Sequence, residues 1–242
     1  MDALILAGGL GTRLATVVSD RAKPVAPVGG RPFVSLLLAH IERCATVRRA
    51  ILCVGHKADT VEAALGDRFG RLALAYSREA QPLGTGGALR LALERFECRA
   101  PVLAFNGDSL CTLELDRLLA FHREQRADAT LGLARVLDAS RFGCVRLLGD
   151  RVDGFVEKGR PGPGWINAGN YVLGRRALDA LLAAAPVCSL ERDVLPALVG
   201  QIRVAGLRSR ARFLDIGVPE DYARAQRYFG PQGADQPGEG SK

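Results

Sequence analysis

The sequence opens with a glycine-rich segment whose composition suits a phosphate-binding turn. Three glycines and a threonine follow a short apolar run: Gly8, Gly9, Gly11 and Thr12. Where a strand ends in glycines, backbone N–H groups can approach phosphate oxygens closely because no Cβ intervenes. Arg13 adds a forked cation and Lys23 a compact point charge for the same anion. The segment therefore predicts a site for a phosphorylated ligand.

Two common phosphate-binding signatures do not fit this segment. The chain contains no Gly-Lys-Ser or Gly-Lys-Thr, and from Gly9 and Gly11 the third glycine of a dinucleotide fingerprint would fall on Leu14. A plain tight turn is the alternative for the glycines alone. The added cations Arg13 and Lys23 favour phosphate binding.

A carboxylate follows a second buried run. Asp108 closes Asn106-Gly107-Asp108, directly after the apolar residues 102–105. Ligands of α/β sheets bind at the carboxyl ends of the strands. Mg²⁺ takes one or two carboxylates there and lets phosphates complete its shell. Asp108 is thus a candidate metal ligand, with an Asx-turn as the alternative for this residue alone.

Strand and helix patterns alternate through the first half of the chain and would position these residues. Strands are predicted at Ala3–Ala7, Ala50–Val54, Leu72–Tyr76 and Val102–Phe105. Helices are predicted at Pro32–Cys44, Asp59–Phe69 and Gly87–Phe96, with another capped by Thr112 and ending near Arg126. This alternation predicts a mainly parallel sheet covered on both faces.

The pattern becomes more antiparallel after residue 128. Strands are predicted at Thr130–Val136, Cys144–Leu148, Val152–Glu157, Trp165–Leu173, Ile202–Val204 and Phe213–Asp215. Gly149-Asp150 predicts a hairpin turn, and helices are predicted at Ala177–Ala184, Leu190–Val199 and Pro219–Tyr228. We expect one domain over residues 1–229, with a nucleotide-binding half (1–128), a facing half (129–229) and a disordered tail (230–242).

Composition excludes several classes of protein. The net charge is +7, but the basic residues form no run and only one Trp and four Tyr are present, so nucleic acid is not an expected partner. No apolar run approaches the roughly 18 residues of a membrane span, and the start lacks a signal peptide, which predicts a cytoplasmic protein. Six scattered cysteines without C-x-x-C predict free thiols.

Taken in order, the motifs resemble those of the sugar-1-phosphate nucleotidylyltransferases over about residues 2–228. The resemblance is carried by Leu6–Leu14 with Lys23-Pro24, Pro27–Pro32, Gly84–Ala88, Asn106–Asp108, Phe142–Val145, Glu157-Lys158, Asn167–Gly169 and Asp215–Tyr222. The chain departs from the family pattern at Arg31 (Lys), Phe213 (Trp) and Val218 (Thr). The resemblance implies a Rossmann-like mixed, mainly parallel sheet flanked by helices, with a smaller antiparallel sugar-binding part.

The resemblance also implies a role for particular residues. For the nucleotide they are Leu6, Gly8, Gly9, Gly11, Thr12, Arg13, Lys23, Glu79, Gly84, Thr85 and Asp108. For the sugar phosphate they are Asn106, Gly143, Glu157, Lys158, Asn167, Gly169 and Glu191. Mg²⁺ would be held by Asp108 and Asp215, and the catalytic groups would be Arg13, Lys23, Asp108 and Lys158.

Some of these roles have structural alternatives. Glu79 would accept hydrogen bonds from guanine N1–H and its amino group, and otherwise is a solvated loop carboxylate. Glu191 and Asp193 would reach sugar hydroxyls or cap their helix. The structural alternative for Glu157-Lys158 is a solvated ion pair. For Asp215 the alternative is a charge at a helix N-terminus.

The implied reaction transfers a nucleoside monophosphate to a sugar 1-phosphate and releases pyrophosphate. The chain looks most like the compact D-glycero-alpha-D-manno-heptose 1-phosphate guanylyltransferases of surface-polysaccharide pathways (capsule, lipopolysaccharide or S-layer glycan). This favours GTP, with a homodimer as one option for the assembly. The alternatives are a mannose 1-phosphate guanylyltransferase, an N-acetylmuramate 1-phosphate uridylyltransferase, and a silent regulatory protein that binds nucleotide-sugar.

Overall fold

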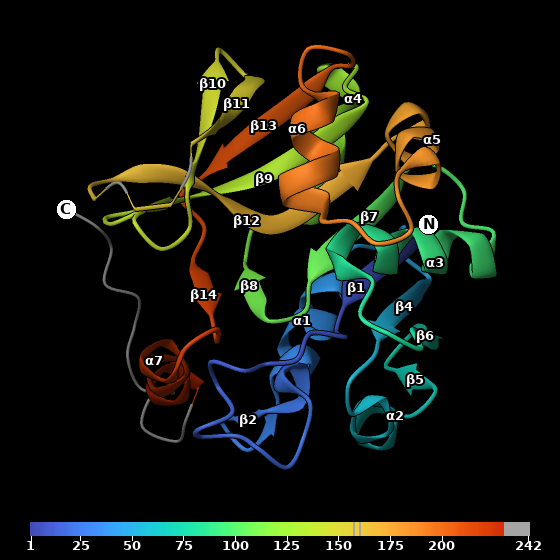
Figure 1. Ribbon diagram of the computed structural model, residues 1–242, viewed down its shortest axis with the longest axis vertical. Helices are drawn as coiled ribbons and strands as arrows, with labels where there is room; N and C mark the ends of the chain where they lie inside the picture. The colour runs from blue at the N-terminus through green and yellow to red at the C-terminus, as the bar shows by residue number, and fades with distance from the viewer. Residues whose placement is uncertain (157, 160, 230–242) are drawn as a thin grey trace.

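A ten-stranded mixed sheet runs through the molecule (Figure 1), in the order β10-β11-β13-β9-β12-β7-β1-β4-β6-β5. The computed structural model describes residues 1–156, 158–159 and 161–229. The strands are β1 (Asp2–Leu6), β4 (Arg49–Val54), β5 (Arg68–Phe69), β6 (Leu72–Arg78), β7 (Val102–Asn106), β9 (Ala129–Val136), β10 (Cys144–Leu148), β11 (Arg151–Val156), β12 (Gly164–Leu173) and β13 (Val204–Ser209). The predicted tail, 230–242, lies outside the described residues.

The first half of the chain forms a parallel core, as its strand–helix alternation predicts. β7, β1, β4 and β6 are neighbours and run parallel. The chain moves from β1 to β4 and β6 on one side, but β7 pairs on the other side, so Leu6 lies opposite Asn106 at the ends of β1 and β7. Such a change of direction opens a crevice at the carboxyl ends of the strands.

The second half continues the same sheet. β12 is antiparallel to both β7 and β9, and the predicted hairpin forms between β10 and β11. β13 instead runs parallel to β9. The mixed sheet, with helices on both faces, confirms the expected fold class.

Alternating side chains of the central strands fill two apolar layers. In β1, Ile5 packs into one layer and Leu4 into the other, and both are fully buried. The first layer is covered by α1 (Phe33–Glu42), α2 (Ala58–Leu65), α4 (Leu115–Glu124) and α7 (Pro219–Phe229). The second is covered by α3 (Gly84–Phe96), α5 (Arg175–Ala183) and α6 (Leu195–Leu198), with the π-helical turn η2 (Leu190–Val194). Burial of both faces explains the nearly continuous apolar strands.

Two small sheets join segments that are distant in sequence. β8 (Ser109–Cys111) pairs with β14 (Phe213–Asp215), and Figure 1 shows them side by side. The hairpin β2 (Pro27–Val28) and β3 (Arg31–Pro32) follows the 3₁₀ turn η1 (Lys23–Val25).

Helix α7 is hydrogen-bonded to the β2–β3 hairpin through Tyr222 and Gln226, a contact that we call the clasp. The Tyr222 hydroxyl and the Gln226 Nε2 both donate to the Pro27 carbonyl, at 2.6 and 2.5 Å. Gly29 N–H donates to Gln226 Oε1 at 3.1 Å. The last described helix therefore supports the segment that follows Lys23.

Several predicted boundaries are wrong. The helix expected to reach Phe69 ends at Leu65, because Gly66 turns the chain with φ +66° and Phe69 enters β5. Thr112 caps no helix, since α4 begins at Leu115. The strand expected at residues 202–204 is β13, which runs from 204 to 209, and the helix expected at residues 190–199 divides into η2 and α6.

All six cysteines are free, as their spacing predicts. Within the described ranges, the structure contains no helix with both the length and the apolar character of a membrane span.

Candidate active site

A cavity of about 260 Å³ lies at the carboxyl ends of β1 and β7. It is lined by Leu6, Gly8, Gly9, Leu10, Lys23, Pro24, Glu79, Pro82, Gly84, Thr85, Ala88, Asn106 and Asp108. Most of the residues predicted to bind the nucleotide are therefore brought together. Gly11, Thr12 and Arg13 belong to the adjoining turn and do not line the cavity.

Lys23 and Asp108 form an ion pair within this cavity. The Lys23 Nζ lies 2.5 Å from the Asp108 Oδ2, and the Lys23 side chain is only 10% exposed. A Cβ added to Gly11, which has φ +62°, would lie 3.3 Å from the Lys23 Cβ, so the glycine turn packs directly on the lysine. The turn and the 3₁₀ segment η1 together place a buried positive charge at the end of the sheet.

Asp215 reaches the same place through the pairing of β8 with β14. It lies opposite Ser109, and the next residue, Ile216, donates its N–H to the Asp108 carbonyl at 3.0 Å. The Asp215 Oδ1 accepts the Gly217 N–H at 2.7 Å. Burial, with the nearby charge of Asp108, raises the pKa of Asp215, and the charge of Lys23 opposes this shift.

This pair of carboxylates fits the needs of Mg²⁺. Asp215 is partly buried beside the like charge of Asp108, an arrangement that a cation bound between such groups would stabilise. Mg²⁺ is held in nucleotide sites by one or two carboxylates and by the phosphates themselves. Asp108 and Asp215 are thus suited to hold such an ion when a triphosphate is present.

Glu79 is fixed at the other end of the cavity by close contacts with glycines. Its Oε2 accepts the Leu83 N–H at 3.1 Å. A Cβ added to Gly8 or Gly55 would lie 2.7 or 2.5 Å from the Glu79 Oε1. Burial raises the pKa of Glu79. The carboxylate is therefore half-buried with one oxygen bound and the other facing two glycines.

Gly55 is a site residue that sequence reasoning missed. It follows β4 directly, and only its contact with Glu79 gives it a role. The signal available in the sequence is its place after a predicted strand, matching Gly8 after β1.

The second glycine cluster is the start of a helix and not a loop, which corrects the helix start predicted at Gly87. α3 begins at Gly84, which has φ +75°. Added Cβ atoms at Gly84 and Gly87 would lie 2.5 Å from the Cys188 carbonyl oxygen and 2.2 Å from that of Pro186. These glycines let the helix pack against the segment before η2.

Thr85 is bound to that segment through its hydroxyl. The Thr85 Oγ1 accepts the Leu190 N–H at 2.8 Å and donates to the Glu191 Oε2 at 2.6 Å. Asp193 instead accepts the Ser189 N–H at 2.7 Å, which makes it a cap of η2. Of the two roles open to Asp193, the capping role is the one that the geometry supports.

Asn167 and Gly169 lie on β12, in the second half of the sheet, and do not line the cavity. The Asn167 Nδ2 donates to the Tyr171 hydroxyl at 2.7 Å, and its Oδ1 accepts the Gly169 N–H at 3.1 Å. A Cβ added to Gly169 would lie 2.9 Å from the Asn106 Cβ. The Asn106 Oδ1 is buried and has no hydrogen-bond partner within the described part of the chain.

The segment before β10 is tied to α7. Arg141 pairs with the buried Asp221 at 2.7 Å, and the rings of Phe142 and Phe213 meet edge to face at 5.6 Å. The N–H of Gly143, which has φ +75°, donates to the Ala139 carbonyl at 3.1 Å. The N–H groups of Gly143 and Gly169 are thus already bound, so these residues have only their carbonyls to offer a ligand.

The remaining predicted residues lie at the surface or outside the described chain. Arg13 and Lys158 are exposed. Glu157 lies outside the described residues. Two of the three histidines have structural contacts, His40 with the Leu113 carbonyl and His122 with the Thr130 hydroxyl, and His56 is exposed.

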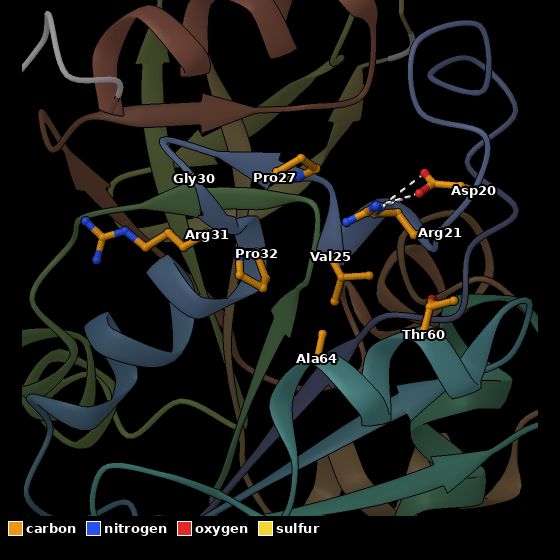
Figure 2. A pocket seen from close by; sticks show the side chains of 9 residues that line it. All are labelled: Asp20, Arg21, Val25, Pro27, Gly30, Arg31, Pro32, Thr60 and Ala64. Atoms are coloured by element: carbon orange, nitrogen blue, oxygen red, sulfur yellow. Dashed lines mark hydrogen bonds and ion pairs between the residues drawn. The ribbon is translucent and has the colours of Figure 1, made fainter.

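A second cavity, also of about 260 Å³, lies between α2 and the β2–β3 hairpin. Figure 2 shows the Val25, Thr60 and Ala64 side chains pointing into it, Arg21 held by Asp20, and the Arg31 guanidinium directed away. None of the residues predicted to bind a ligand lines this cavity.

Comparison with known proteins identifies similar chains over nearly the whole length. The nucleotidyl transferase family matches residues 2–230. A D-glycero-alpha-D-manno-heptose 1-phosphate guanylyltransferase of Aneurinibacillus thermoaerophilus is 36% identical over 94% of this chain and 97% of its own length. A mannose-1-phosphate guanylyltransferase of Mycobacterium tuberculosis is 39% identical over 93% of this chain but only 63% of its own.

Among solved structures, HddC from Yersinia pseudotuberculosis in complex with GMP-PN superposes with a TM-score of 0.82. It is 33% identical, and the match covers 94% of this chain and 99% of that one. A UDP-glucose pyrophosphorylase from Acinetobacter baumannii shares the fold, with a TM-score of 0.82 at 19% identity.

Proposed function

The chain belongs to the nucleotidyl transferase family, and we propose that it transfers GMP from GTP to a sugar 1-phosphate, forming a GDP-sugar and pyrophosphate. The observation that carries the proposal is the meeting of Lys23, Asp108 and Asp215 at the end of the glycine turn. These three charges come from distant parts of the chain. Lys23 and Asp108 line the cavity and Asp215 lies beside them, where a triphosphate needs cations and a metal-binding carboxylate pair.

The choice of guanine is supported by Glu79. Its Oε1 packs against Gly8 and Gly55 and accepts no hydrogen bond within the described residues, while its Oε2 is held by Leu83. An ionised carboxylate can accept hydrogen bonds from N1–H and the 2-amino group of guanine, whereas uracil offers one such donor and adenine presents a different edge. Guanylyltransferases among the similar chains support the same base.

In the proposed reaction, a phosphate oxygen of the sugar 1-phosphate attacks the α-phosphorus of GTP and pyrophosphate leaves. Two anions must meet, so the neutralisation of charge is the main task of the site. Lys23 and Arg13 would stabilise the charge that grows on pyrophosphate, and Lys158 would hold the attacking phosphate. This nucleophile is ionised at neutral pH and needs no general base. Asp108 and Asp215 would hold Mg²⁺, which would supply positive charge to offset the repulsion between the reacting anions.

For the sugar, we propose D-glycero-alpha-D-manno-heptose 1-phosphate, with mannose 1-phosphate as the second candidate. The heptose assignment rests on the guanylyltransferase of Aneurinibacillus thermoaerophilus, a relative that this chain matches over almost its full length. The second rests on a relative of higher identity that is much longer than this chain. We further propose that the product supplies a surface polysaccharide. Within the described residues, Asn167 keeps one amide hydrogen and one oxygen lone pair without a protein partner, which supports the proposal that it contacts a sugar hydroxyl.

The test is a pyrophosphate-release assay with four nucleoside triphosphates and a panel of sugar 1-phosphates, with and without Mg²⁺. We expect Mg²⁺-dependent release that is fastest with GTP and the heptose phosphate. Release with another pair would reassign the substrates. If no pair gave release, the chain would be a binding protein and not an enzyme.

A further inference from the structure

Tyr171 is a buried titratable residue to which the proposed reaction gives no task. It lies on β12, is fully buried, and is among the largest side chains of the core. Burial and the nearby charge of Glu191 raise the pKa of Tyr171, so its hydroxyl stays protonated and can donate one hydrogen bond. A buried hydroxyl needs partners, and within the described residues this one hydrogen-bonds to Asn167 and Glu191.

One partner belongs to the sugar side. The Asn167 Nδ2 donates to the Tyr171 hydroxyl at 2.7 Å. The other amide atom of Asn167 accepts the Gly169 N–H at 3.1 Å. These two bonds fix which end of the amide is oxygen and which is nitrogen. The face of Asn167 that remains for a ligand is therefore set by Tyr171.

The other partner belongs to the nucleotide side. The Tyr171 hydroxyl donates to the Glu191 Oε1 at 3.1 Å, and the Glu191 Oε2 accepts the Thr85 hydroxyl at 2.6 Å. Thr85 lines the cavity at the first turn of α3. The Ser189 hydroxyl, at 3.2 Å, also donates to the Glu191 Oε2. Both oxygens of Glu191 are thus occupied by protein donors.

We propose that Tyr171 and Glu191 form a positioning relay, Asn167–Tyr171–Glu191–Thr85, which sets the sugar-reading amide relative to the helix that borders the nucleotide. Glu191 then acts through its neighbours and not as a direct ligand of a sugar hydroxyl. The inference rests on the proposed function only in treating Asn167 as a sugar contact. The hydrogen-bond chain itself is independent of the substrate.

The kinetic test compares Tyr171→Phe and Glu191→Gln with the wild type, using the sugar 1-phosphate on which the wild type is most active. Tyr171→Phe should raise the KM for the sugar 1-phosphate on the order of tenfold, as expected for one lost buried hydrogen bond, and leave the KM for GTP within about twofold. Glu191→Gln should raise both KM values, because it also loosens Thr85. The double variant should show no larger effect on the sugar KM than the stronger single variant.

Tyr76→Phe is the matched control. It removes another tyrosine hydroxyl, one that donates to the Gly66 carbonyl away from the cavity, and it should leave both KM values unchanged. An unchanged sugar KM in Tyr171→Phe, or effects that multiply in the double variant, would overturn the relay.

A second measurement needs no substrate. The side-chain amide resonances of Asn167 are assigned by their loss in Asn167→Asp. Glu191→Gln should shift them in the wild-type background but not in a Tyr171→Phe background, because Glu191 reaches Asn167 only through Tyr171. No shift in the wild-type background, or an equal shift in both, would refute the relay. If the wild type used no sugar 1-phosphate, the proposed function would fail, and this spectrum would still decide the relay.

Discussion

Glu79→Gln is the sharpest test of how the cavity chooses its base. The Oε2 of Glu79 is committed to the Leu83 N–H at 3.1 Å, so the amide oxygen of glutamine is expected to keep that bond. The NH₂ group then takes the place of Oε1, beside Gly8 and Gly55. A donor would face the N1–H and amino donors of guanine. Losing a hydrogen bond to a charged group costs about 1.5–3 kcal/mol, which corresponds to roughly 10- to 150-fold in kcat/KM for GTP.

The assay measures kcat/KM for GTP and for inosine triphosphate, whose base lacks the 2-amino group. The wild type should have a higher kcat/KM for GTP than for inosine triphosphate. Glu79→Gln should lower kcat/KM for GTP by the factor above, so that kcat/KM becomes nearly equal for the two nucleotides. Gly55→Ala displaces the same carboxylate by a steric clash, since its new Cβ would lie 2.5 Å from the Glu79 Oε1. It should weaken the preference in the same direction. If Glu79→Gln kept both the rate and the preference of the wild type, Glu79 would not read the base.

Three further outcomes can be measured on single variants. Arg13→Ala should lower kcat by on the order of 10²–10³, the scale for one donor to a developing charge, in a steady-state pyrophosphate assay; near-normal turnover would remove Arg13 from the site. Gly29→Ala and Gly30→Ala both place a side chain at positive φ, but only the first meets a backbone, with its Cβ 2.1 Å from the Phe229 carbonyl oxygen. In urea denaturation, Gly30→Ala should lower the free energy of unfolding by about 1–2 kcal/mol, and Gly29→Ala should lower it by about 1–3 kcal/mol more. Equal losses of stability in the two variants would contradict the clasp by α7. Burial lowers the pKa of His122 below 6.5, so the unfolded chain binds the proton more tightly. The free energy of unfolding should therefore fall as the pH drops through and below 6.5, by at most about 1.4 kcal/mol per pH unit for this group, and His122→Gln should flatten that decline.

The sequence predicts the parallel core and the glycine turn well, because both have local signals. Strand β1 ends at Leu6, within an apolar run (residues 3–7) that Gly8 follows, and β4 and β7 are also largely apolar. The position of Asp108 after β7 then follows from the rule that ligands gather at strand ends. These features depend on residues close together in the chain.

Features that depend on distant contacts could not be predicted from the residues alone. The strand at Phe213–Asp215 is predicted and forms β14, but its three-residue partner β8 is too short for a periodic pattern, and their pairing is what brings Asp215 to Asp108. The helix predicted to begin at Gly87 begins at Gly84, because the packing of these glycines against residues 186–188 cannot be read from the sequence. For the same reason, nothing in the sequence around Glu191 indicates that Thr85 and Tyr171 occupy its two oxygens.

The clasp between α7 and the β2–β3 hairpin also bears on how the protein is made. Tyr222 holds the carbonyl of Pro27, a residue synthesised 195 positions earlier. At about 5–20 residues per second, the ribosome needs roughly 10–40 s to cover that interval. During this time the nascent chain carries its glycine turn and Lys23 without the support that fixes the hairpin behind them. Competence to hold a triphosphate should therefore arise late, when α7 leaves the ribosome, although the residues proposed to contact the phosphates are among the first to emerge.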